Sequence, residues 1–175
     1  METCFIISAF GDPDCDKIYD EVYVPICESL NLKPVRLDKE NDGSLVMNQI
    51  ITFINDSEVI IADLTLARPN CYFEIGFAMG AKKESRVFLT CREDHSSGSK
   101  NFKSEAYRIH FDVAGYDINF WKPDEREKFR QQLEDKIKSR MKSWVKTEVT
   151  KTPNSEKPKD QRFNQIANAA NKDQT

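Results

Sequence analysis

Two consecutive stretches decide the fold of this chain: the apolar run V-I-I-A at Val59–Ala62 and the segment D-L-T-L-A-R-P-N-C-Y-F-E-I-G-F-A-M-G at Asp63–Gly80. The first predicts a buried strand, and Pro69 in the second predicts a helix whose first turn carries Glu74. A strand that turns into a helix is the repeating unit of α/β folds. We therefore expect Asp63 and Glu74 to converge at the rim outside the carboxyl end of the strand, where open α/β sheets bind ligands.

The same alternation of strand and helix extends along the chain. Apolar runs that predict further strands lie at Cys4–Ala9, Lys33–Leu37 and Arg86–Thr90, with a shorter fifth strand at Tyr107–Val113. Apolar residues at helical spacing predict helices at Ile18–Leu30, interrupted by Pro25, and at Val46–Ile54. This order predicts a central, mainly parallel sheet with helices on both faces.

The last part of the chain differs in character. A helix at Asp124–Val145 places an apolar stripe on one face, formed by Phe129, Leu133, Ile137, Met141 and Trp144. We divide the chain into an α/β domain at 1–121, this amphipathic helix at 122–146 and a polar tail at 147–175, which we expect to be disordered. The stripe either packs on the domain or pairs with a second copy of the chain.

Charge is unevenly distributed between these parts. Residues 1–121 carry 12 Lys and Arg against 20 Asp and Glu, whereas residues 122–175 carry 14 against 9. An acidic domain argues against a nucleic-acid ligand, since phosphate binding needs clustered Lys and Arg. The basic end is interpreted as a solvated helix face, with contact to RNA, DNA or a partner protein as the alternative.

Cysteine spacing and hydropathy exclude several classes of protein. The 5 cysteines show no C-x-x-C spacing, so we expect free buried thiols and neither a disulfide framework nor a metal site, and no cofactor is expected. No apolar stretch approaches the roughly 18 residues that a membrane span needs, and the start of the chain lacks a basic region before its apolar run. We expect a cytoplasmic protein without a membrane partner.

Three motifs resemble the nucleoside 2-deoxyribosyltransferase-like superfamily, particularly its TIR-like bacterial branch: A-D-L-T at Ala62–Thr65, P-N-x-Y-x-E-x-G-x-A at Pro69–Ala78 and S-A-F-G at Ser8–Gly11. The resemblance spans roughly Cys4 to Asp117. It implies a flavodoxin-like or Rossmann-like three-layer sandwich and cleavage of an N-glycosidic bond. Members transfer deoxyribose between bases, hydrolyse nucleotides or consume NAD, and some act in antiviral defence. They often oligomerise, so we expect a homo-oligomer.

The two acids fit this chemistry. Cleavage builds positive charge on the anomeric carbon, which a carboxylate stabilises or attacks. We assign this role to Glu74, held ionised by the helix dipole, and expect Asp63 to hydrogen-bond or protonate the leaving base, with a raised pKa. Structural readings stay open: Asp63 as a loop cap, and Glu74 as an acid that favours a helix N-terminus.

Six further residues are candidate substrate contacts: Ser8, Phe10, Gly11, Asp38, Asn70 and Gly76. Asn70 is also expected to cap its helix, Gly76 to permit close approach, and Asp38 to contact a ribose hydroxyl. The segment Cys91–Glu105 is either a mobile lid over this site or a plain connecting loop.

One departure from the family pattern bears on the reaction. Base-exchanging members carry a Gly-Thr pair before their glutamate, and Pro69-Asn70 stands at the comparable place. This favours hydrolysis of a nucleoside, nucleotide or NAD over base transfer. The alternative is a non-catalytic sensor that binds a nucleotide and engages a partner protein through its C-terminal helix. A nucleic-acid-binding accessory protein is a third, weaker hypothesis.

Overall fold

The computed structural model describes residues 1–39 and 46–150. The chain forms two compact units, Met1–Lys142 and Ser143–Thr175, and the fold described below is that of the first. Residues 151–175, which make up most of the tail expected to be disordered, lie outside the described residues. No helix among the described residues is long and apolar enough to cross a membrane.

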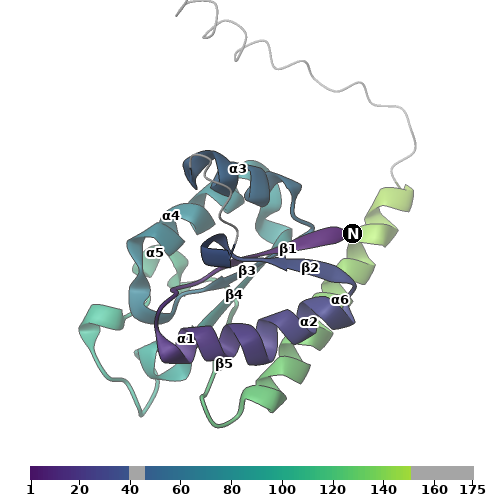
Figure 1. Cartoon of the computed structure of the whole chain (residues 1–175). Helices are drawn as coiled ribbons and strands as arrows, with labels where there is room; N and C mark the ends of the chain where they lie inside the picture. The colour runs from purple at the N-terminus through teal and green to yellow at the C-terminus, as the bar shows by residue number, and fades with distance from the viewer. Residues whose placement is uncertain (40–45, 151–175) are drawn as a thin grey trace, which may run out of the picture. The chain divides into compact units, whose positions relative to one another are not determined.

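A sheet of five strands forms the centre of the first unit (Figure 1). The strands are β1 (Glu2–Ile7), β2 (Leu32–Val35), β3 (Val59–Asp63), β4 (Val87–Arg92) and β5 (Ile118–Trp121). They lie in the order β2-β1-β3-β4-β5, and every neighbouring pair is parallel. The predicted α/β class is therefore confirmed. This order is the flavodoxin-like one, in which the chain changes direction across the sheet between β1 and β3.

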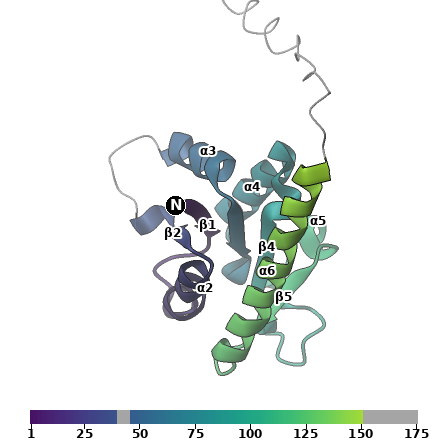
Figure 2. The ribbon, with the colours of Figure 1, turned by 90° about the vertical axis from the view of Figure 1, so that its right-hand side faces the viewer.

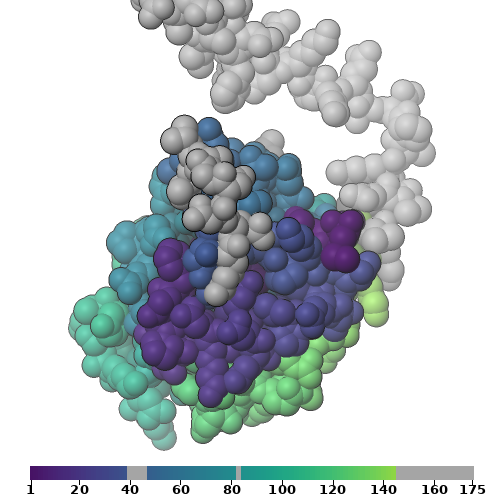
Figure 3. Space-filling model, in the orientation of Figure 1, coloured from purple at the N-terminus to yellow at the C-terminus, as the bar shows by residue number. Residues whose placement is uncertain are grey.

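Helices cover both faces of the sheet (Figure 2). They are α1 (Pro13–Ile18), α2 (Val24–Ser29), α3 (Val46–Asp56), α4 (Pro69–Ala78), α5 (Phe111–Ala114) and α6 (Arg126–Thr150). The views place α3, α4 and α5 on one face and α1, α2 and α6 on the other. In the space-filling view, the purple and dark blue segments that include α1 and α2 form the front, with α6 in green below (Figure 3).

Alternation along the strands builds a core on each face. Phe5, Ile60 and Leu89 belong to a cluster that also contains Ile54 of α3 and Ile75 of α4. The intervening strand residues point to the opposite face, because successive side chains of a strand alternate. Both faces are covered, which explains why the strands read as nearly continuous apolar runs.

The C-terminal helix closes the second core. Phe129, Leu133 and Ile137 are each no more than 4% exposed within the first unit, and the Arg140 guanidinium lies 4.5 Å from the ring centroid of Phe88 on β4. Of the two alternatives for the apolar stripe, the structure therefore shows packing on the domain. These three side chains are not available to a second copy of the chain.

The structure differs from the sequence-based prediction at two places. Pro25 does not break the predicted helix: a π-helical stretch at Tyr19–Tyr23 joins α1 to α2 without a gap, and Pro25 lies in the first turn of α2, after this change of helix type. The fifth strand was placed wrongly. Tyr107–Val113 forms a turn and the start of α5, and the strand that pairs with β4 follows at Ile118–Trp121.

Candidate functional site

The predicted substrate residues lie in the segments that follow three neighbouring strands. Ser8, Phe10 and Gly11 follow β1, Asp38 lies in a 3-10 turn after β2, and Asn70 is the second residue of α4, after β3. The carboxyl ends of parallel strands meet at one edge, so these segments share the rim at the switch point between β1 and β3. The topology thus brings together the elements that the sequence analysis selected.

A buried arginine ties two of these segments together. The guanidinium of Arg36, only 2% exposed, donates to Asp38 Oδ1 at 2.6 Å and Oδ2 at 2.8 Å, and to Asp16 Oδ1 at 2.9 Å. Asp16 in turn accepts a bond from the backbone N–H of Gly11 at 3.1 Å. Both Asp38 oxygens thus serve an internal ion pair, and a bidentate pair of this kind holds the rim in shape.

Asp63 forms the centre of a buried cluster. Its Oδ2 accepts hydrogen bonds from the Tyr23 hydroxyl at 2.6 Å and the Trp121 indole at 3.0 Å. Its Oδ1 accepts from the backbone N–H of Thr65 at 2.9 Å and the Thr65 hydroxyl at 2.5 Å. The residue is 1% exposed. Four donors from three segments thus fix this carboxylate.

This geometry does not fit the predicted role of Asp63. Both oxygens are engaged by protein donors, and the partners Tyr23 and Trp121 come from the α1–α2 segment and from β5. Ala62, the preceding residue, faces the α3–α4 core, so Asp63 points to the opposite side of the sheet from α4. We find no shared hollow between the two acids among the described residues. Asp63 holds the strand ends together and does not stand open to a leaving base.

Glu74 lies in the second turn of α4, not in the first as expected, because the helix begins at Pro69. The side chain is 7% exposed and has no hydrogen-bond or ion-pair partner among the described residues. Burial raises the pKa of its carboxyl to about 7. The expectation that the helix dipole holds this group firmly ionised is therefore wrong, since desolvation outweighs it.

The other predicted contacts are placed unevenly. Phe10 is half exposed, and Gly11 adopts φ +76°, a conformation that favours glycine. Ser8 is 5% exposed, and its hydroxyl is buried without a partner among the described residues. Gly76 faces open space, so its lack of a side chain is not required by packing. The cap of α4 is Arg68 and not Asn70, which is exposed.

The sequence analysis missed a charged cluster behind the proposed lid. Arg92 donates to Asp94 Oδ1 at 2.8 Å and to Asp14 Oδ2 at 2.6 Å, and Asp94 Oδ1 lies 2.6 Å from His95 Nδ1. His95 is fully buried and stacks on Tyr107 at 5.3 Å. These ion pairs and hydrogen bonds therefore hold the first residues after β4 in place. In the sequence, the run of four consecutive charged or titratable residues, R-E-D-H at Arg92–His95, could have indicated this cluster.

Three open cavities of about 890, 500 and 370 Å³ lie along the described residues. The largest borders β5, and the second lies at the carboxyl ends of β4 and β5, beside Arg92 and Trp121. Neither Asp63 nor Glu74 lines any of the three. Within the described ranges, no group of three or more His, Cys, Asp or Glu is arranged to hold a metal ion. The chain matches no protein-family model and no curated protein.

Proposed function

We propose that this chain cleaves the N-glycosidic bond of a nucleoside, a nucleotide or NAD, as a member of the nucleoside 2-deoxyribosyltransferase-like superfamily. One observation carries the proposal: Glu74 holds a buried carboxyl, without a partner among the described residues, on the helix that starts at the switch-point rim. A carboxyl whose pKa burial moves to about 7 is typical of a reactive group.

Glu74 supports the reaction in its ionised form. Its carboxylate attacks the anomeric carbon, or stabilises the positive charge there, while the bond from that carbon to the base breaks. Water then adds to the anomeric carbon and, where a glycosyl ester has formed, breaks its bond to Glu74; the water's hydroxyl stays on the sugar and its proton balances the departing base. Both oxygens of Asp63 accept hydrogen bonds from the protein, so we propose that the departing base takes its proton from solvent and not from Asp63. Asp63 instead holds the strand ends in position.

The burial of the Glu74 carboxylate favours its interaction with the positive charge that develops on the anomeric carbon. A buried carboxylate at neutral pH is less stabilised by water than an exposed one, so it gains more from an adjacent positive charge. At the rim after β1, Phe10 is 51% exposed and offers a surface for a sugar or base. Substrates of this kind are cytoplasmic metabolites, and we place the activity there. Hydrolysis is favoured over base transfer because of Pro69-Asn70.

The second candidate is a nucleotide-binding sensor without turnover. The observation that favours it is the engagement of Asp63 by four protein hydrogen bonds, which leaves one acid where the proposed chemistry was expected to use two. As a sensor, the rim binds a nucleotide and the exposed face of α6 engages a partner protein.

Base release separates the two candidates. Purified protein is incubated with deoxynucleosides, nucleoside monophosphates and NAD, and free base is measured by chromatography. We expect release that falls at least about 100-fold in Glu74→Gln, since loss of one stabilising group at a reacting centre costs roughly that factor. Glu84→Gln, at an exposed glutamate after the same helix, is the matched control. Ligand-induced thermal stabilisation without release identifies a sensor.

A further inference from the structure

The cavity of about 890 Å³ lies beside β5, where the crossover before that strand contributes only a short helix. β4 and β5 are joined through α5, which has only four residues. Ile118 and Phe120 of β5 pair in register with Leu89 and Cys91, two members of the α3–α4 core, so they face the same side of the sheet. β5 is an edge strand, and on this side Phe120 stays 40% exposed. An apolar strip of sheet is left as the floor of a groove.

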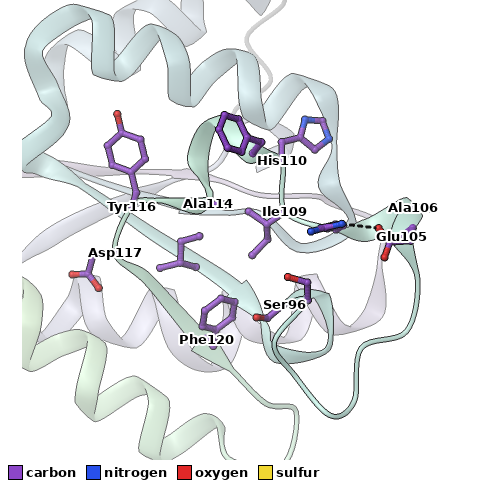
Figure 4. A pocket seen from close by; sticks show the side chains of 13 residues that line it. Ser96, Glu105, Ala106, Ile109, His110, Ala114, Tyr116, Asp117 and Phe120 are labelled. Atoms are coloured by element: carbon purple, nitrogen blue, oxygen red, sulfur yellow. Dashed lines mark hydrogen bonds and ion pairs between the residues drawn. The ribbon is translucent and has the colours of Figure 1, made fainter.

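The groove has the volume of a small-molecule site. Its volume is about 890 Å³, within the range of roughly 300–1,000 Å³ that ligand pockets occupy. Figure 4 shows Ile109, Phe120 and Ser96 turned toward its centre, between the 105–108 turn and α5. Apolar side chains thus line the base of the groove, and the Ser96 and Tyr116 hydroxyls lie on different sides of it.

Exposed aromatic side chains gather around this groove. Phe111 is 92% exposed, Tyr116 43% and Phe120 40%, and all three line the cavity. Aromatic rings left in water gain most from stacking against another flat ring. A saturated aliphatic ligand would use the floor but not the edges and faces of these rings. The lining therefore favours a flat aromatic compound.

The charges of the lining indicate that this compound is uncharged. Arg108 pairs with Glu105 at 3.2 Å, and Asp117 pairs with Lys136 at 2.6 Å. Each acidic or basic side chain that lines the groove, His110 aside, thus already has an opposite charge beside it. His110 stacks on Tyr72 of α4 at 4.1 Å. With these charges neutralised in pairs, the described residues of the lining offer no unpaired acid or arginine to attract an ionised ligand, whereas a neutral ring with hydrogen-bonding edges needs none.

From these features we propose that the groove beside β5 binds a flat, uncharged heteroaromatic ring compound, at a site separate from Glu74. Glu74 does not line the groove. The site is thus independent of the proposed reaction and holds whether or not the chain turns over a substrate.

The test uses 2-aminopurine, a neutral fused-ring compound whose fluorescence falls when it stacks on aromatic rings. Titration of the full chain is expected to give saturable quenching. Phe111→Ala and Phe120→Ala are each expected to weaken binding about tenfold, which corresponds to about 1.4 kcal/mol, near the upper end of what a stacked ring pair contributes. Phe111 is almost fully exposed, so its replacement leaves folding intact. Phe73→Ala, at a 57% exposed ring on α4 outside the groove, is the matched control.

Four results would overturn the proposal. They are the absence of saturable quenching, equal affinity in the groove variants and the control, loss of binding in Glu74→Gln, and conversion of a dimer to a monomer by Phe120→Ala in sedimentation. The third result would assign the probe to the site of the proposed function. The fourth would show that a second copy of the chain covers the groove. Binding that survives Glu74→Gln without base release in the wild-type protein would sustain this site while the proposed function fails.

Discussion

The hydroxyl of Tyr23 lies 2.6 Å from Oδ2 of Asp63, and this contact joins the segment between α1 and α2 to the carboxyl end of β3. The same hydroxyl lies 2.8 Å from Oγ1 of Thr90 on β4. Burial, followed by the charge of Asp63, raises the pKa of Tyr23 well above its ordinary value, so the phenol stays protonated and donates. One tyrosine thereby links a helix to two strands beneath the proposed site.

Tyr23→Phe is expected to lower the free energy of unfolding by about 1–3 kcal/mol, because it leaves a buried carboxylate with one donor fewer. Urea denaturation of variant and wild type measures the loss. Tyr19→Phe is the control: Tyr19 is also buried, and its ring still packs on Arg36 at 4.1 Å after the change. Equal stability of the two variants would contradict the role given to the Tyr23 hydroxyl.

Glu74→Gln is expected to stabilise the protein increasingly as the pH rises. The pKa of Glu74 is about 7 in the folded protein, against an ordinary value of 4.5 for a solvated glutamate, so the folded protein holds a proton between these two values. Below about pH 4.5 the acid is neutral in both states, and above about pH 7 the folded state bears the full cost of a buried charge. A shift of this size corresponds to about 3 kcal/mol. The difference in unfolding free energy between variant and wild type is measured from pH 4 to 8.5.

Other titrating groups cancel in that difference, because both proteins carry them. The exposed Glu84, changed to Gln, supplies the control and is expected to show no such slope. A variant-minus-wild-type difference that stays constant from pH 4 to 8.5 would show that Glu74 is well solvated.

The pH dependence of base release should follow the same group. If the Glu74 carboxylate is the reactive form, kcat/KM rises with pH and reaches half its maximum near pH 7, since kcat/KM reports the pKa of the free protein. The profile is recorded with a nucleoside whose base does not titrate in this range. A rate that falls through pH 7 would instead make Glu74 a general acid, and the nucleophilic step proposed above would be incorrect.

Strands β1, β3 and β4 could be predicted from sequence because buried parallel strands read as short apolar runs. β5 could not, since I-N-F-W at Ile118–Trp121 is short and includes a polar residue, whereas Tyr107–Val113 offers a longer alternating pattern. That pattern is used differently in the structure: the Tyr107 ring stacks on His95, and Phe111 is left in solvent. Tertiary contacts thus outweighed the alternation of apolar and polar residues that predicted a strand at Tyr107–Val113.

The site shows the same limit. The sequence predicted that Asp63 and Glu74 converge at one rim of the sheet, whereas Asp63 ends β3 on the face away from α4 and Glu74 lies in the second turn of α4. The sequence could not show that Asp63 faces away from α4, because its partners Tyr23 and Trp121 are 40 and 58 residues distant in the chain. The burial of Glu74 depends on which face of α4 is turned toward the sheet. The sequence does not specify that face, because apolar residues occur on all sides of this helix.

Asp94→Asn is expected to destabilise the protein at neutral pH and to do so less at pH 3. Burial alone would raise the pKa of Asp94, but hydrogen bonds from Arg92, Lys103 and His95 outweigh it and hold the pKa at about 2. The carboxylate thus contributes stability above its ordinary pKa of about 3.8, and this contribution falls as the pH drops toward 2. Thermal unfolding at pH 7 and pH 3 measures the change. Asp112→Asn, at an exposed position, is the control. A loss of thermal stability in Asp94→Asn that is equal at both pH values would exclude the ion-pair explanation.

Leu133→Ala tests whether α6 belongs to the domain. The side chain is 1% exposed among the apolar residues of the first unit, so its truncation is expected to cost about 2–5 kcal/mol through lost burial and the cavity left behind. The urea midpoint is measured at several protein concentrations. Gln132→Ala, at the exposed neighbouring position, is the control and should change stability by less than about 0.5 kcal/mol. A loss for Leu133→Ala that depends on protein concentration would mean that its neighbours come from a second copy, because only an association equilibrium shifts with concentration.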